Sequence, residues 1–183
     1  MNSAFVKTVT KAKQYNVLHK MNNMCRYIDD IGIANCSNFL EMAANIYPSY
    51  LTLNKANVSS VVNSPFLDLS ISVQNSKFMV KVYNKTDDYS FTVISFPFLD
   101  SNLSTNVCYS VYFGEVLRYL RICSCLEDFV IRTRMFSAML ITRGYSKASL
   151  SRQLSKVLFR YLDLTIKFDS RRTVSDIIKE VLS

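Results

Sequence analysis

The sequence is poor in the residues that interrupt or crosslink a chain. Its 183 residues include only three glycines, three prolines, one histidine and no tryptophan. Five cysteines, an odd number, argue against a disulfide framework and favour a reducing compartment, the nucleus or the cytoplasm. No secretory signal is visible at the N-terminus, which also favours an intracellular protein. With His19 alone, no Ser–His–Asp or Cys–His catalytic set can be assigned.

Features of a zinc site and of a membrane segment are also missing. Cys123 and Cys125 form a Cys-x-Cys pair, which on a helix would point its thiolates to different sides, and a structural zinc site needs four ligands. We therefore expect no zinc and assign the cysteines to the core. No apolar run approaches the ~18 residues of a membrane span, so no membrane partner is expected.

Basic residues are present in excess, mostly in the second half. Hydrophobic residues make up 49% and charged residues 20% of a chain with net charge +8, which is typical of a globular protein. Residues 1–100 carry nine Lys/Arg against seven Asp/Glu, and residues 101–183 carry thirteen against seven. Such a surface attracts nucleic acid or anionic lipid; the alternative is a solvated basic surface that binds neither.

Strand patterns dominate the first half. Residues 22–35 are predicted to form a strand, an acidic turn and a second strand, and residues 37–47 a short amphipathic helix. Residues 66–74 and 77–84 alternate apolar and polar side chains on either side of a polar turn, which is typical of a β-hairpin. A further extended stretch is predicted over 89–96.

Helix patterns dominate the second half. Residues 107–164 are predicted to be helix-rich, with Gly144 separating two helical runs, and residues 172–182 add a short last helix. Strands followed by helices predict an α+β fold. We expect two domains, residues 1–100 with the strands and residues 101–183 with the helices.

The feature richest in chemistry is the segment 25–35, CRYIDDIGIAN. Asp29 and Asp30 fall at the predicted tip of an apolar hairpin, where strands can hold both carboxylates open to a substrate. Mg²⁺ prefers such oxygen ligands, and two ions about 4 Å apart can activate a hydroxyl and stabilise a leaving pyrophosphate. An ordinary polar turn is the alternative for Asp-Asp alone. Tyr-x-Asp-Asp between β-type apolar residues is rarer and favours metal binding.

Tyr27-Ile28-Asp29-Asp30 resembles the Tyr-x-Asp-Asp hairpin of reverse transcriptases. Further segments similar to the family follow in order: Ile46-Tyr47-Pro48, Leu51-Thr52-Leu53, Phe66-Leu67-Asp68-Leu69, residues 82–89, Phe96-Pro97, residues 109–124 and Arg143-Gly144-Tyr145. The resemblance covers about residues 22–165. Its Phe-Leu-Asp and Lys-x-x-Asp elements are similar to retroelement enzymes of the Penelope-like kind.

This resemblance implies an RNA-directed DNA polymerase, a nucleotidyltransferase, of which the chain holds part of the palm and a thumb-like helical region. Asp29 would be the principal ligand of Mg²⁺ or Mn²⁺, Asp30 the second, and Tyr27 would pack near the primer terminus. The hairpin 66–83 would lie where such enzymes grip the primer strand, although for Phe66, Phe78 and Tyr83 themselves we favour simple sheet core.

The same family needs another catalytic aspartate upstream, and residues 1–28 contain no Asp or Glu. We therefore expect a truncated enzyme that lacks the fingers and the strand bearing that aspartate, and that is inactive alone. Asp68 follows the hairpin and is not a substitute, and we interpret Asp87 and Asp88 as a solvated turn.

Nine basic residues would contact a template–primer duplex, RNA–DNA or DNA: Arg118, Arg121, Arg132, Arg134, Arg143, Lys147, Arg152, Lys156 and Arg160. Leucines between them would pack the helices together. Two alternatives to a truncated polymerase stay open. One is a non-catalytic nucleic-acid-binding remnant, and the other is a partial subunit completed by a second chain that supplies fingers and the missing aspartate.

Overall fold

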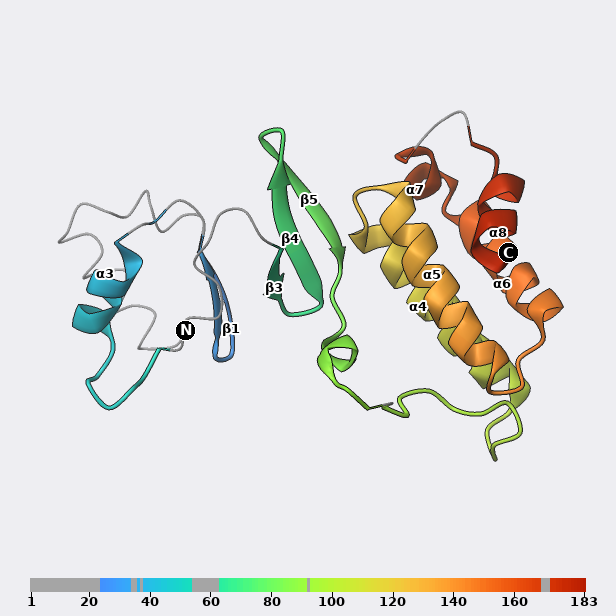
Figure 1. The fold of residues 1–183 in the computed structure, drawn as a ribbon, viewed down its shortest axis with the longest axis horizontal. Helices are drawn as coiled ribbons and strands as arrows, with labels where there is room; N and C mark the ends of the chain where they lie inside the picture. Colours follow the sequence, from blue (N-terminus) through green and yellow to red (C-terminus); the bar gives the residue numbers. More distant parts are fainter. Residues whose placement is uncertain (1–23, 34–35, 37, 54–62, 92, 169–171) are drawn as a thin grey trace. The chain divides into compact units, whose positions relative to one another are not determined.

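The computed structural model describes residues 24–33, 36, 38–53, 63–91, 93–168 and 172–183. The chain divides into two compact units, residues 1–59 and 60–183. Within the described residues there are six α-helices and two small antiparallel sheets, so the predicted α+β class is confirmed (Figure 1). The second sheet groups with the helices, whereas the expected domain boundary near residue 100 would have separated them.

The first unit contains the predicted acidic hairpin and the short helix after it. Strands β1 (Met24–Tyr27) and β2 (Asp30–Ile33) pair antiparallel, with Tyr27 opposite Asp30. The loop is therefore only two residues long. Helix α3 (Phe39–Ile46) lies within the predicted range and is followed by Tyr47, whose extended backbone is what the next residue, a proline, requires.

The second unit begins with a three-stranded antiparallel sheet of order β3-β4-β5. Its strands are β3 (Ser64–Phe66), β4 (Leu69–Gln74) and β5 (Lys77–Val82). The β4–β5 hairpin is confirmed, but a single strand over 66–74 is wrong, because the chain reverses at Leu67–Asp68. The predicted extended stretch over 89–96 is also wrong: a 3-10 turn, η1 (Lys85–Asp88), follows β5, and the described residues after it form no strand.

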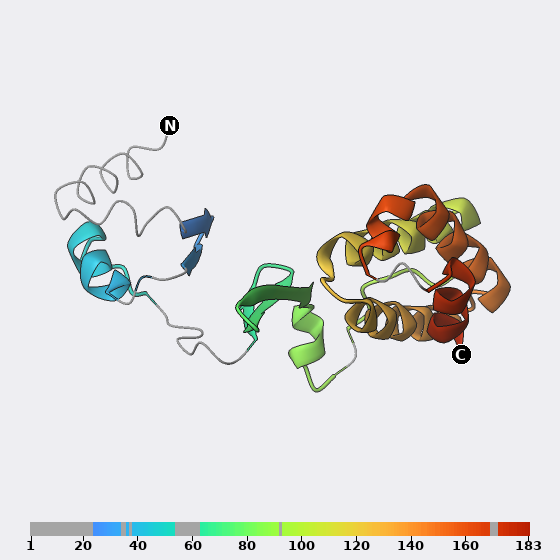
Figure 2. The ribbon, with the colours of Figure 1, turned by 90° about the horizontal axis from the view of Figure 1, so that it is seen from above.

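Five helices complete the described part of this unit: α4 (Thr105–Ile122), α5 (Leu126–Ile141), α6 (Lys147–Arg160), α7 (Leu162–Ile166) and α8 (Val174–Leu182). Helix α4 packs against α5 and α6, and α8 packs against the same two helices, so four helices surround one core (Figure 2). The short α7 packs against α4 and α6. Strand β5 contacts α4 and α5, which joins the sheet to this bundle.

The helix core follows the apolar pattern of the sequence. Leu120, Leu150, Leu154 and Leu158 are fully buried and Leu117 is partly buried, as predicted. Gly144, with φ +88°, separates α5 from α6 and adopts the left-handed conformation that glycine tolerates.

The cysteines are only partly where the sequence predicted. Cys123 and Cys125 do not lie on one helix: the first ends α4 and the second precedes α5. Cys108 and Cys123 are buried in the core as predicted, whereas Cys25 is exposed, so its assignment to the core is wrong. In the part of the chain that the structure describes, no helix is long and apolar enough to cross a membrane.

Candidate functional site

The tip of the β1–β2 hairpin exposes both predicted metal ligands. Asp29 lies in the two-residue turn and Asp30 begins β2, directly opposite Tyr27. Because side chains alternate along a strand, Tyr27 and Asp30 share one face and Arg26 and Ile31 the other. Tyr27, Asp29 and Asp30 are all exposed. Among the described residues, neither carboxylate has a hydrogen bond or an ion pair, so both are open to a ligand.

The turn that presents Asp29 is strained. Ile28 has φ +51°, in the left-handed region, and its side chain is 74% exposed. Ile28 is therefore not a covered apolar flank of the hairpin. Left-handed backbone costs an L-residue ~1–2 kcal/mol, and a β-branched residue there is an outlier. The Nε of Arg26 donates to the carbonyl oxygen of Ile28 at 3.0 Å, which helps hold this conformation.

The donor chemistry fits a hard cation, but the number of donors is small. Carboxylate oxygens suit Mg²⁺ or Mn²⁺, which are commonly held by one or two carboxylates together with substrate phosphates. Within the described residues, no group of three His, Cys, Asp or Glu side chains could hold one ion. Asp29 and Asp30 alone would therefore hold an ion weakly, and would hold it tightly only with oxygens from a bound phosphate or from another carboxylate.

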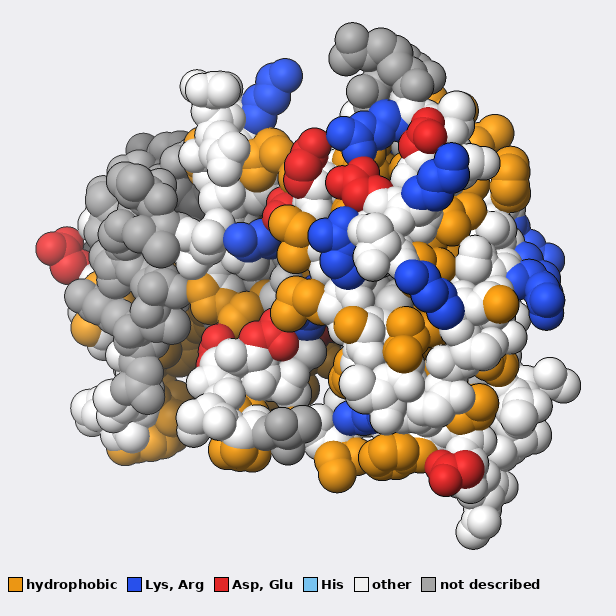
Figure 3. All heavy atoms as spheres, turned by 45° about the vertical axis from the view of Figure 1, so that its right-hand side comes forward, with side chains coloured by type: hydrophobic (Ala, Val, Ile, Leu, Met, Phe, Trp, Pro, Cys, Tyr) orange, Lys and Arg blue, Asp and Glu red, His pale blue; other side chains and the backbone are white. Residues whose placement is uncertain are grey.

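The nine predicted nucleic-acid contacts fall into two groups. Lys and Arg side chains are spread over the helical unit with apolar side chains between them (Figure 3). Arg121, Lys147, Arg152, Lys156 and Arg160 are exposed and have no ion pair within the described residues. Of these, Arg121 lies over the Tyr161 ring, with its guanidinium carbon 5.7 Å from the ring centroid. These five remain available to a ligand.

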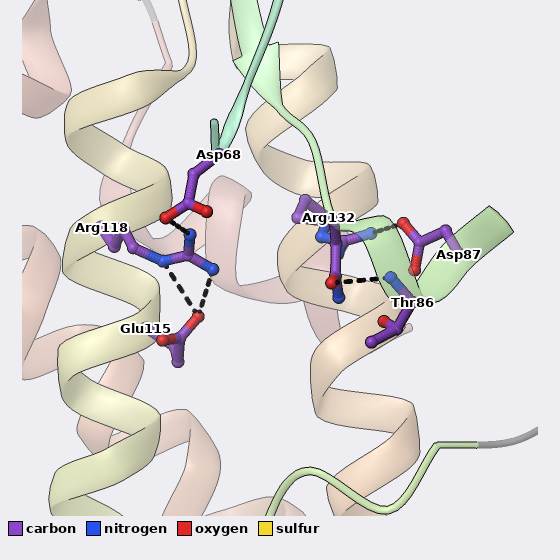
Figure 4. A network of polar contacts seen from close by, with 7 residues as sticks. Asp68, Thr86, Asp87, Glu115, Arg118 and Arg132 are labelled. Atoms are coloured by element: carbon purple, nitrogen blue, oxygen red, sulfur yellow. Dashed lines mark hydrogen bonds and ion pairs between the residues drawn. The ribbon is translucent and has the colours of Figure 1, made fainter. Parts of the chain in front are cut away.

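The other four basic residues are engaged inside the second unit. Arg118 pairs with Asp68 at 3.0 Å and with Glu115 at 2.8 Å, and Arg132 pairs with Asp87 at 2.5 Å (Figure 4).

The remaining two of these arginines bind backbone oxygens. Arg134 donates to the carbonyl of Glu180, and the buried Arg143 donates to the carbonyl of Phe96. Arg134 thus joins α8 to α5, and Arg143 joins the segment before α4 to the end of α5, uses that their charge alone does not reveal.

Asp87 and Asp88 lie exposed in the 3-10 turn η1, as the interpretation of a solvated turn expected, but both also have partners. Asp87 accepts a hydrogen bond from Arg132 on α5, and Asp88 accepts a hydrogen bond from the hydroxyl group of Tyr83. That hydrogen bond raises the pKa of Tyr83. Sheet core is wrong for Phe78, which is 66% exposed, whereas Phe66 and Tyr83 are partly buried.

A second hairpin repeats the first one's local geometry with different electrostatics. Phe66-Leu67-Asp68-Leu69 forms a two-residue turn in which Leu67 has φ +55°. Asp68 thus occupies the same place in its turn as Asp29. However, Asp68 is engaged by Arg118, whereas Asp29 has no such partner among the described residues.

Two features of the second unit were not predicted from the sequence. Ser124 anchors β5: its N–H donates to the Val80 carbonyl at 2.8 Å, and its hydroxyl accepts from the Val80 N–H at 2.9 Å. A groove of about 540 Å³ also lies between α4 and α6. The only sequence signal for this groove is the spacing of Gln153, Lys156 and Arg160, which puts the three side chains on one helix face.

Comparisons of the chain with protein-family models, with curated proteins and with solved structures each return no match. Any function therefore has to be argued from the residues and their geometry.

Relieving the strained turn should stabilise the hairpin. Ile28→Gly removes the clash of a β-branched side chain in left-handed backbone, so we expect the free energy of opening to rise by up to about 1 kcal/mol. Hydrogen exchange of the β1 and β2 amides measures this. Leu67→Gly should act similarly on its own hairpin, whereas Ile31→Gly, within a strand, should lower protection. If Ile28→Gly lowers protection as Ile31→Gly does, the turn is not strained.

Proposed function

We propose that this chain is part of a retroelement reverse transcriptase, comprising the end of the palm and a thumb-like helical region. Its chemistry would be RNA-directed DNA synthesis. One observation carries the proposal: Tyr27-Ile28-Asp29-Asp30 forms a tight antiparallel turn with two unengaged, exposed carboxylates beside an exposed tyrosine. In this account Asp29 is the principal metal ligand, Asp30 the second, and Tyr27 packs near the primer terminus.

The order of the other segments supports the same proposal. Phe66-Leu67-Asp68-Leu69 leads into a β-hairpin, and a helical bundle follows it, as a primer-gripping hairpin and a thumb would. Among retroelement enzymes, the Phe-Leu-Asp and Lys-x-x-Asp segments favour a Penelope-like source.

The proposal includes incompleteness of the metal site. Two-metal nucleotidyl transfer needs ligands that clamp both ions, and the hairpin offers two adjacent carboxylates. A further aspartate must come from another palm strand, in the same polypeptide or in a second chain that also supplies fingers. Ion binding would then be weak in this chain alone, and incorporation of nucleotides slight.

Primer extension tests this proposal. The isolated chain should incorporate at most traces of nucleotide on RNA or DNA templates, with Mg²⁺ or Mn²⁺. Adding a polypeptide with reverse-transcriptase fingers and the upstream palm strand should raise incorporation. Asp29→Asn should abolish that gain, while Asp68→Asn, at the matched position of the second hairpin, should retain it.

Two outcomes would contradict this account. Robust incorporation by the isolated chain that Asp29→Asn abolishes would show that the metal site is complete. Restored incorporation that Asp29→Asn leaves unchanged would remove the catalytic role of the hairpin.

A second candidate function is nucleic-acid binding without catalysis, through the helices. Its supporting observation is on α6, where Arg152, Lys156 and Arg160 lie on successive turns, exposed and without an ion pair within the described residues. A row of this kind can follow a phosphate backbone, with affinity that is largely independent of sequence and falls steeply with salt.

Reversing these charges should weaken duplex binding. For the triple variant Arg152→Glu, Lys156→Glu, Arg160→Glu, we expect the salt dependence of log affinity to become shallower by about 0.9 for each phosphate that the variant no longer neutralises. An RNA–DNA duplex should bind as well as duplex DNA or better. The control Lys77→Glu, Lys85→Glu, Lys179→Glu makes the same change in net charge with exposed residues outside α6. Equal weakening by both variants would reduce the effect to net charge.

A further inference from the structure

The groove between α4 and α6 combines charged, polar and aromatic side chains. Its lining is Ser110 and Phe113 from α4 and Gln153, Lys156 and Arg160 from α6, around about 540 Å³. The two residues of α4 are three positions apart, and the three of α6 are spaced i, i+3 and i+7. Each set therefore faces the groove from one side of its helix. The two helices pack against each other, so the groove belongs to one unit of the chain.

The charge of the groove selects an anion. Lys156 and Arg160 are exposed, and within the described residues neither has a carboxylate partner. In this part of the chain, no acidic side chain lines the groove. Arginine can form paired hydrogen bonds with phosphate oxygens, and lysine adds a mobile point charge. Phosphate groups are therefore the natural counterpart of this end of the groove.

The rest of the lining suits a nucleobase. Phe113 is half-buried and offers aromatic surface. The side-chain amide of Gln153 has no hydrogen-bond partner within the described residues, so both its oxygen and its nitrogen are available. The Ser110 hydroxyl donates to the carbonyl of Asn106 at 2.8 Å and can still accept a hydrogen bond. A lipid headgroup or free phosphate would leave these apolar and amide groups unused.

In a duplex, base faces are stacked and pairing edges are occupied. An aromatic side chain and an amide can engage both face and edge only when the nucleotide is unpaired. We infer that the α4–α6 groove binds an unpaired nucleotide of a single-stranded nucleic acid, with phosphate on Lys156 and Arg160 and the base against Phe113 and Gln153. The inference rests on the nucleic-acid binding proposed for the helices and is independent of Asp29 and Asp30.

Fluorescence anisotropy with three probes tests the groove: a short oligothymidylate, an abasic strand of the same length, and a duplex. The full chain should prefer oligothymidylate to the abasic strand. Phe113→Leu keeps apolar packing but removes the ring, and should weaken oligothymidylate binding about fivefold or more, with little change for the other probes. Gln153→Ala, which leaves the core intact, should act in the same direction.

Charge variants separate the phosphate contacts from the base contacts. Lys156→Gln with Arg160→Gln should weaken all three probes, whereas Lys147→Gln, at the start of α6, should leave the preference for oligothymidylate unchanged. Equal affinity for the oligothymidylate and abasic strands, unaffected by Phe113→Leu and Gln153→Ala, would overturn the groove while duplex binding stands. Failure of all three probes to bind the wild-type chain would overturn both.

Discussion

Pairing of Asp68 with Arg118 and of Asp87 with Arg132 connects the small sheet and the 3-10 turn to the helices. Each pair is at least partly exposed, so each contributes on the order of 1 kcal/mol or less. The reciprocal hydrogen bonds between Ser124 and Val80 also attach β5 to the segment between α4 and α5. Their directionality makes the attachment of the sheet to the helices specific. The two ion pairs also decide which charged side chains can bind a ligand, because they occupy two acids and two arginines.

What remains unpaired on the described residues is informative. In the first unit it includes the carboxylate pair Asp29 and Asp30, held at a tip by a strained turn. In the second unit it includes the basic row on α6. Strained backbone persists where surrounding structure holds it, and it is concentrated at functional sites. The proposed metal site depends on the unengaged acids of this turn, and the proposed nucleic-acid binding depends separately on the unengaged basic residues of α6.

Much of the fold could be predicted from the sequence because its elements are strongly patterned. Apolar β-type residues around an acidic turn predicted the β1–β2 hairpin, alternation predicted the β4–β5 hairpin, and helical spacing predicted the buried leucines. The turn at Leu67–Asp68 was missed because it contains no glycine, proline or asparagine, so alternation runs on through it. The break at Cys123–Cys125 was missed for the same reason: no helix-breaking residue marks it.

The candidate site divides in the same way. Tyr27, Asp29 and Asp30 are close in sequence, and a local turn is enough to bring them together. The nine basic residues could not be separated in this way, because in the sequence they look equivalent until their distant partners are known. Asp68 lies fifty residues from Arg118, and Glu180 lies far from Arg134. Only tertiary structure distinguishes arginines that attach the sheet or a helix from residues that face solvent.

Mn²⁺ can directly test the contrast between the two matched turns, Asp29 unengaged and Asp68 ion-paired, on which the proposed metal site depends. In amide spectra of the full chain, we expect Mn²⁺ to broaden signals around Asp29 and Asp30 and to leave those around Asp68 sharp. Asp29→Asn with Asp30→Asn should abolish the broadening. Equal broadening at both turns, or broadening that survives the double substitution, would show that the Asp29–Asp30 turn is not a selective cation site.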